Sequence, residues 1–140
     1  MDLDPGSSII PRYLALILVM LIGGGYFASA ETAFASVNPI RIISDADDGS
    51  RRAKTALQIL DNFDEALTAI LIGNNIMHIG CSSVATLLAQ KIWGNASVTI
   101  VTFVTALTVF IFAEMIPKSY AKDCNERLVL RLAPSLFFIM

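Results

Sequence analysis

Long apolar stretches alternate with short polar segments along the chain, and three of the apolar stretches are long enough to cross a lipid bilayer. We expect membrane-spanning helices over residues 10–37, 65–90 and 95–116, because about 20 residues of α-helix cover the hydrocarbon thickness of a membrane. Each stretch carries at most one carboxylate. The pattern predicts an all-α membrane protein in which residues 1–140 form a single transmembrane domain embedded in the lipid bilayer.

The polar segment between the first two stretches has a helical periodicity of its own. Apolar residues recur at helical spacing over residues 50–63 with charged residues between them, which predicts an amphipathic helix on the membrane face. We expect Asp45, Asp47 and Asp48 to cap the start of this helix, with a second cation site as the alternative. An apolar segment from about residue 126 is too short to span, so it is either a juxtamembrane helix or the start of a fourth span that the sequence cuts off.

Basic residues are distributed unevenly about the spans and predict the orientation of the chain. Eight of the ten lysine and arginine residues follow the first or the third span, at Arg41, Arg51, Arg52, Lys54, Lys118, Lys122, Arg127 and Arg131. Positively charged residues concentrate on the cytoplasmic side of membrane proteins. We therefore expect a multi-pass protein of the cell (plasma) membrane, with its amino terminus outside and its carboxyl end in the cytoplasm.

Composition narrows the class of protein further. Hydrophobic residues make up 55% of the chain and charged residues 16%, whereas a soluble domain carries about 25% charged residues. The formal net charge of −2 gives no basic footprint, so no nucleic-acid partner is expected. Cys81 lies in an apolar stretch and Cys124 in a charged one, so no disulfide is expected.

Polar residues interrupt each of the three spans near one end. They are Ser29, Glu31 and Thr32 in the first span, Asn74, Asn75 and His78 in the second, and Glu114 in the third. Counted from the expected cytoplasmic ends, these groups lie roughly 6–15 Å inside the membrane. We therefore expect them to meet in one layer. Carboxylate, amide and hydroxyl oxygens suit Mg²⁺ or Ca²⁺, while zinc and copper sites favour clustered Cys and His, which the sequence lacks.

Glycine and proline residues in the spans predict local helix breaks. Gly24 is the middle residue of a run of three glycines, and Pro117 follows the glutamate of the third span. Proline cannot donate to the carbonyl four residues before it, and such free carbonyls coordinate ions in broken transporter helices. Close packing is the alternative for the first span, since small residues recur every four positions at Gly25, Ser29 and Ala33.

Each polar residue of the layer also has an interpretation that involves no ion. Asn74 and Asn75 would serve equally well as hydrogen-bonding groups between helices, and His78 as a polar core residue. Glu114 would pair with Lys118 one turn later. Taken together, however, two acids and two amides at one depth have no basic partner within the membrane apart from Lys118, which neutralises only one carboxylate.

At these residues the chain resembles a known family. The transmembrane domain of the CNNM/CorC (CorB) magnesium transporters has similar motifs in the same order and spacing, and here they read Ser29-Ala30-Glu31-Thr32-Ala33, Ile72-Gly73-Asn74-Asn75-Ile76 and Glu114-Met115-Ile116-Pro117-Lys118. The resemblance implies a homodimer with three spans per protomer and a belt of juxtamembrane helices. It also implies cytoplasmic CBS modules that bind ATP after this domain, which the sequence does not include.

The resemblance further implies a Mg²⁺ site in a cavity open to the cytoplasm. Its ligands would be the Ser29 hydroxyl, the amide of Asn74 or Asn75, the Glu114 carboxylate and backbone carbonyls. Two residues depart from the family pattern: His78 stands where relatives often have asparagine, and an alanine replaces the glycine that often precedes the motif glutamate.

The function that the resemblance implies is Na⁺-coupled Mg²⁺ efflux, and a Mg²⁺-sensing membrane module, which the same site would serve, is the alternative. An enzyme is not expected, because the spans hold no recognisable hydrolase or metalloprotease motif. Side chains two positions apart on a regular helix point about 200° apart. If Ser29 faces Mg²⁺, Glu31 therefore faces a neighbouring space, and we expect it to form a second, coupling site with Thr32 and His78.

Overall fold

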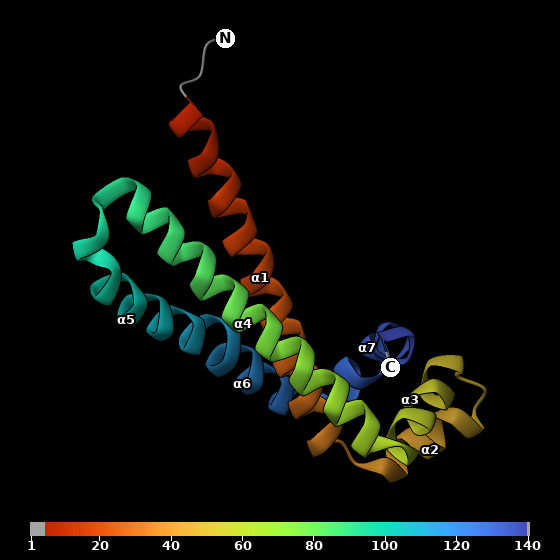
Figure 1. Ribbon diagram of the computed structural model, residues 1–140. Helices are drawn as coiled ribbons and strands as arrows, with labels where there is room; N and C mark the ends of the chain where they lie inside the picture. Colours follow the sequence, from red (N-terminus) through yellow and green to blue (C-terminus); the bar gives the residue numbers. More distant parts are fainter. Residues whose placement is uncertain (1–4, 140) are drawn as a thin grey trace.

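The computed structural model describes residues 5–139. Its membrane-spanning helices are α1 (Pro5–Ser36), α4 (Phe63–Trp93) and a composite third span that begins with α5 (Val98–Val109). Three stretches of the described chain are long and apolar enough to cross a membrane, namely Ile10–Ser36, Phe63–Trp93 and Val98–Asp123. The predicted all-α membrane architecture with three spans is confirmed. Figure 1 shows the three spans side by side.

Helices α1 and α4 pack against each other with small residues between them and large apolar residues outside. Gly73 lies against the ring of Phe27, and near the other end of the pair the Lys91 ammonium lies 5.1 Å from the centre of the Tyr13 ring. The outer face of α4 exposes Ile72 and Ile79. This distribution is typical of membrane helices, where small residues allow close approach and lipid solvates the large apolar side chains.

Helix α1 continues without interruption through its three glycines. A methyl group added at Gly24 would lie 3.2 Å from the imidazole of His78 and 3.3 Å from Cβ of Ala113. This corrects the break expected at Gly24: the glycine lets three helices approach closely and leaves the α-helix intact.

The small residues Gly25, Ser29 and Ala33 on α1 are likewise covered by other parts of the same chain. Gly25 lies against the ring of Pro117, Ser29 contacts the Pro117 carbonyl, and Ala33 is fully buried. This stripe therefore serves close packing, and Gly25 and Ser29 pack against the third span of the same protomer.

The third span changes its helix type before Pro117. After α5, residues Phe110–Met115 form a π-helical segment, and α6 (Ile116–Asp123) completes the span. The N–H of Ile116 donates to the carbonyl of Ile111, five residues earlier. The wider π-helical turn accommodates Pro117, because proline has no backbone N–H to donate and its ring crowds the preceding turn. The irregularity expected near Pro117 is therefore a π-helical turn, and the third span remains helical on both sides of it.

Three further helices form a group at the end of the bundle away from the amino terminus, which we call the belt (Figure 1). They are α2 (Pro39–Asp47), α3 (Arg51–Asp61) and α7 (Asn125–Ile139). Helix α3 lies within the predicted amphipathic range, and α7 begins one residue before the expected start. Because α7 packs against α3 and α1, it lies in the belt as a juxtamembrane helix.

The sequence reading missed helix α2. The Asn38 side chain caps it by accepting a hydrogen bond from the Ile40 N–H at 3.0 Å, and Pro39 occupies its first turn. Asp45 and Asp47 belong to this helix, so the acidic run does not cap α3 as expected. The cap of α3 is Ser50, whose hydroxyl accepts from the Ala53 N–H at 3.2 Å.

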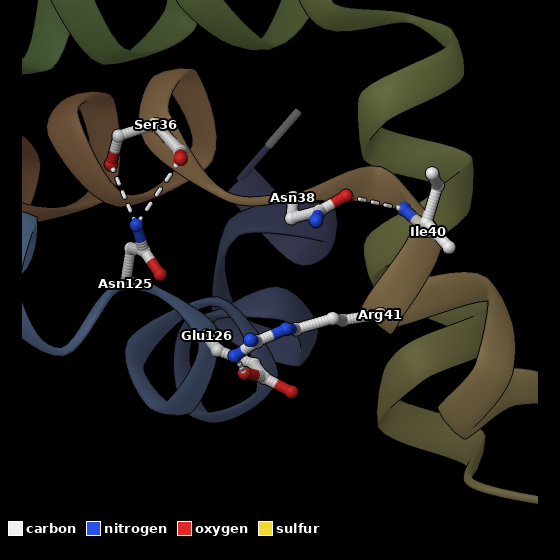
Figure 2. A network of polar contacts seen from close by, with 6 residues as sticks. All are labelled: Ser36, Asn38, Ile40, Arg41, Asn125 and Glu126. Carbon is white, nitrogen blue, oxygen red and sulfur yellow. Dashed lines mark hydrogen bonds and ion pairs between the residues drawn. The ribbon is translucent and has the colours of Figure 1, made fainter.

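Polar contacts connect the belt to the first span (Figure 2). The Asn125 amide donates to the Ser36 carbonyl at 3.1 Å and contacts the Ser36 hydroxyl at 3.3 Å. Arg41 and Glu126 form an ion pair with Nη1 and Oε2 3.2 Å apart. Asn125 thereby holds the carboxyl end of α1 to the start of α7, and the ion pair holds α2 to α7.

Candidate functional site

Polar residues of the second and third spans approach one another at the level of Gly24 in the first span. His78 of α4 and Ala113 of the π-helical segment both lie against this glycine. Glu114 follows Ala113, and Asn74 lies one turn from His78 on the same face of α4. The packing of α1, α4 and the third span therefore brings together the polar residues of the second and third spans.

His78 and Glu114 form the central contact of this layer. His78 Nδ1 and Glu114 Oε1 are 3.6 Å apart, and 22% and 28% of their side chains are exposed. The second ring nitrogen of His78 is buried and has no hydrogen-bond partner among the described residues. The pair therefore combines the Glu114 carboxylate, which can bind a cation, with the His78 imidazole, whose Nε2 atom lacks a hydrogen-bond partner among the described residues.

A cavity of about 250 Å³ opens beside this pair. His78, Ser82, Phe110 and Glu114 contribute to its lining. One water molecule takes about 30 Å³ in the liquid, so the cavity can hold a cation that keeps part of its hydration shell. Sequence reasoning missed Ser82, although it follows His78 by four residues and hence shares its helix face.

The structure distinguishes the two neighbouring asparagines of α4. Asn74 is 7% exposed, and its side-chain oxygen has no hydrogen-bond partner in the described part of the chain. Asn75 is exposed on the outer face of the helix. A buried polar atom without a partner costs about 1–3 kcal/mol. Asn74 is therefore the asparagine that would gain from a ligand.

Ser29 does not line the cavity beside His78 and Glu114. Its hydroxyl donates to the Pro117 carbonyl at 3.4 Å, a long hydrogen bond, and it lines an apolar cavity of about 410 Å³ with Tyr26 and Tyr120. Ser29 and Glu114 thus border separate cavities in this structure. The predicted Mg²⁺ ligands share one layer but are not gathered around one point.

The residues expected to form a second, coupling site are also distributed among different partners. Glu31 Oε2 lies 4.0 Å from Lys118 Nζ. The Thr32 carbonyl accepts a hydrogen bond from the Ser36 hydroxyl at 2.6 Å, and the partner of His78 is the carboxylate of the third span. The structure therefore pairs Lys118 with Glu31, and not with the glutamate of its own helix.

The donor set of the layer restricts the cations that it suits. Within residues 5–139, no three side chains of His, Cys, Asp and Glu gather into a group able to hold a metal ion, and this includes the acidic run of α2. A cation in the layer would depend on one carboxylate, neutral oxygens and water. Mg²⁺ commonly keeps several waters and takes few protein carboxylates, so this donor set is compatible with it.

Comparison with known proteins identifies similar sequences over most of the chain. The model of the cyclin M transmembrane N-terminal domain (CNNM) family matches residues 15–140. A UPF0053 protein of Haemophilus influenzae is 32% identical over 112 residues, which cover 80% of this chain and 27% of the relative. The UPF0053 inner membrane protein YfjD of Escherichia coli is 33% identical over 114 residues, covering 81% and 26%. The chain thus spans about a quarter of the length of these two curated relatives.

Proposed function

Since the chain belongs to the CNNM transmembrane-domain family, we propose that this integral membrane domain moves Mg²⁺ out of the cell in exchange for Na⁺. The cargo would enter a cavity that faces the cytoplasm and would be coordinated in the polar layer. The donor chemistry supports this proposal, because the layer offers carboxylate, amide and hydroxyl oxygens at the depth where the three spans meet.

The observation that carries the proposal is the buried amide oxygen of Asn74. This oxygen lies within a membrane span, where water is scarce, and has no hydrogen-bond partner among the residues described. Polar groups inside membranes are costly and usually face a partner or an ion pathway. A cation bound near Asn74 and Glu114 would satisfy the amide oxygen and neutralise a carboxylate at once.

We propose Asn74 and Glu114 as the main protein ligands, with water completing the coordination shell. Ser82 contributes a hydroxyl to the wall of the cavity that His78 and Glu114 line. Ser29 remains a proposed ligand because its hydroxyl and the Pro117 carbonyl beside it both offer oxygen atoms that could coordinate Mg²⁺. Bringing Ser29 to the ion would require α1 and the third span to shift relative to each other. Glu31 is a proposed contributor to the coupling of transport to Na⁺.

The setting of the domain is part of the proposal. We place the belt in the cytoplasm by the distribution of basic residues and the protein in the cell membrane; one relative is named an inner membrane protein. We also propose that the functional unit is a homodimer. The full-length protein would carry CBS modules that bind ATP in the cytoplasm, as the family resemblance implies.

Flux measurements in proteoliposomes test the proposed function. Wild-type protein should move Mg²⁺, faster with an opposing Na⁺ gradient than without one. Asn74→Ala should reduce this flux, while Glu65→Gln, which changes an exposed carboxylate at the start of α4, should not. Mg²⁺ binding without any flux would indicate the sensing module in place of the transporter. The absence of Mg²⁺ binding would overturn both.

A further inference from the structure

Lys118 brings a positive charge into the polar layer. Its ammonium lies 4.0 Å from the Glu31 carboxylate, and 42% of its side chain is exposed. It also follows Glu114 by four residues, a rise of about 6 Å along a helix axis. Lysine carries its compact charge on a flexible four-carbon stem. The ammonium is therefore paired with Glu31, is attached one helical turn from Glu114 along the third span, and has open space on one side.

The formal charges of the layer are not balanced. Glu31 and Glu114 supply two negative charges, and Lys118 supplies one positive charge. Among these three side chains, one negative charge is uncompensated. A divalent cation beside Glu114 would reverse this imbalance while Lys118 stays in place. Charges interact strongly in a membrane interior, so a bound divalent cation and the Lys118 ammonium would disfavour each other.

We infer that Lys118 is an internal competitor of the transported cation. Its ammonium offsets part of the negative charge of the layer when no divalent cation is bound, and moves toward its exposed side when one binds. The inference rests on the proposed function, because it requires a divalent cation at Glu114. It adds a residue that adjusts the affinity of the site without being a ligand.

Competition of this kind has a direct consequence for transport. A transport site must bind its ion well enough to capture it and weakly enough to release it. An ammonium held within reach of the site opposes binding and replaces the ion as it leaves. Removing that charge should therefore tighten binding and slow release, a combination that a merely structural ion pair does not produce.

The test measures Mg²⁺ affinity by calorimetry in detergent and Mg²⁺ flux in proteoliposomes. Lys118→Gln should bind Mg²⁺ about tenfold more tightly than wild type, and its flux should be slower. Lys118→Arg keeps the charge and should stay close to wild type. Lys122→Gln removes a charge from an exposed position one turn later on α6 and should change neither quantity.

A second comparison separates competition from a structural role, since Lys118→Gln leaves Glu31 without its ion-pair partner. In a Glu31→Gln background no such unpaired carboxylate remains, and adding Lys118→Gln should again tighten binding about tenfold. Unchanged or weaker binding in both backgrounds would overturn the inference while wild type still binds Mg²⁺. If wild type itself binds no Mg²⁺, the proposed function fails and the inference fails with it.

Discussion

His78 on α4 and Glu114 in the π-helical segment face each other with Nδ1 and Oε1 3.6 Å apart, beside a cavity of about 250 Å³. The contact joins the second and third spans at the level where Gly24 brings in the first. The π-helical turn contains one more residue than an α-helical turn and so changes the direction of the side chains around it. Glu114 is consequently the carboxylate on which cation binding should depend most.

Replacing Glu114 by glutamine tests this role. Glu114→Gln keeps the shape of the side chain and removes its charge, so Mg²⁺ affinity should fall at least about a hundredfold. Calorimetry in detergent measures the affinity. Glu65→Gln is the matched control, because it removes an exposed carboxylate at the start of α4. Equal affinities in wild type and Glu114→Gln would remove Glu114 from the site.

The two asparagines of α4 give a second test in which neighbouring residues have opposite expectations. Asn74→Ala removes a buried neutral oxygen and should weaken Mg²⁺ binding about tenfold. Asn75→Ala alters an exposed amide and should leave the affinity unchanged. The same calorimetric titration compares them. A larger loss for Asn75→Ala would reverse the assignment.

The sequence predicted the spans and the polar layer because both depend on local patterns. Long apolar stretches define the spans, and the depth of Asn74 and Glu114 follows from counting residues. The sequence could not show which asparagine faces inward, since adjacent residues on a helix differ only by a rotation about its axis. It also could not show that Lys118 contacts Glu31, because that contact depends on how α1 and α6 pack.

Two errors in the sequence analysis have clear physical reasons. The run of three glycines around Gly24 is equally compatible with a break and with close helix packing, and only the neighbouring helices decide between them. Helix α2 was missed although Asn38 and Pro39 form a normal helix start. The acidic residues that follow were interpreted as a cap for the next helix, which left no helix for Asn38 to begin.

The connection between α1 and α7 gives a prediction about stability. Asn125→Ala removes the two contacts to Ser36 and should lower the free energy of unfolding by about 1–2 kcal/mol. Arg41→Ala removes an ion pair whose arginine side chain is 70% exposed, so its effect should stay below about 1 kcal/mol and vanish in high salt. Thermal unfolding in detergent ranks the two variants. A larger effect of Arg41→Ala would show that the ion pair between α2 and α7 stabilises the belt more than the hydrogen bonds between α1 and α7.

Assembly can be predicted from the faces that the fold leaves uncovered. The small-residue stripe of α1 packs inside the protomer, so it cannot form the contact between protomers. The outer face of α4 exposes the Asn75 amide between Ile72 and Ile79, and lipid cannot satisfy an amide there. We expect this face to contact a second copy. Mass measurement in mild detergent should give a dimer, and a monomer alone would contradict the expectation.

Gly23 and Gly24 provide the last prediction, because the same substitution meets different neighbours at adjacent positions. A methyl group at Gly23 would lie 2.8 Å from the sulfur of Met77, near the end of a flexible side chain that can move aside. At Gly24 it would lie between the His78 ring and Ala113, where neither neighbour moves freely. Alanine also favours a helix over glycine by up to about 1 kcal/mol, while overpacking costs about 1–3 kcal/mol.

Gly23→Ala should therefore keep or raise the unfolding temperature in detergent, and Gly24→Ala should lower it. Gly24→Ala should also weaken Mg²⁺ binding, because the ring it displaces contacts Glu114. Equal unfolding temperatures for the two variants would mean that the three spans separate easily at this level. In that case Gly24 would have no special role in bringing the polar layer together.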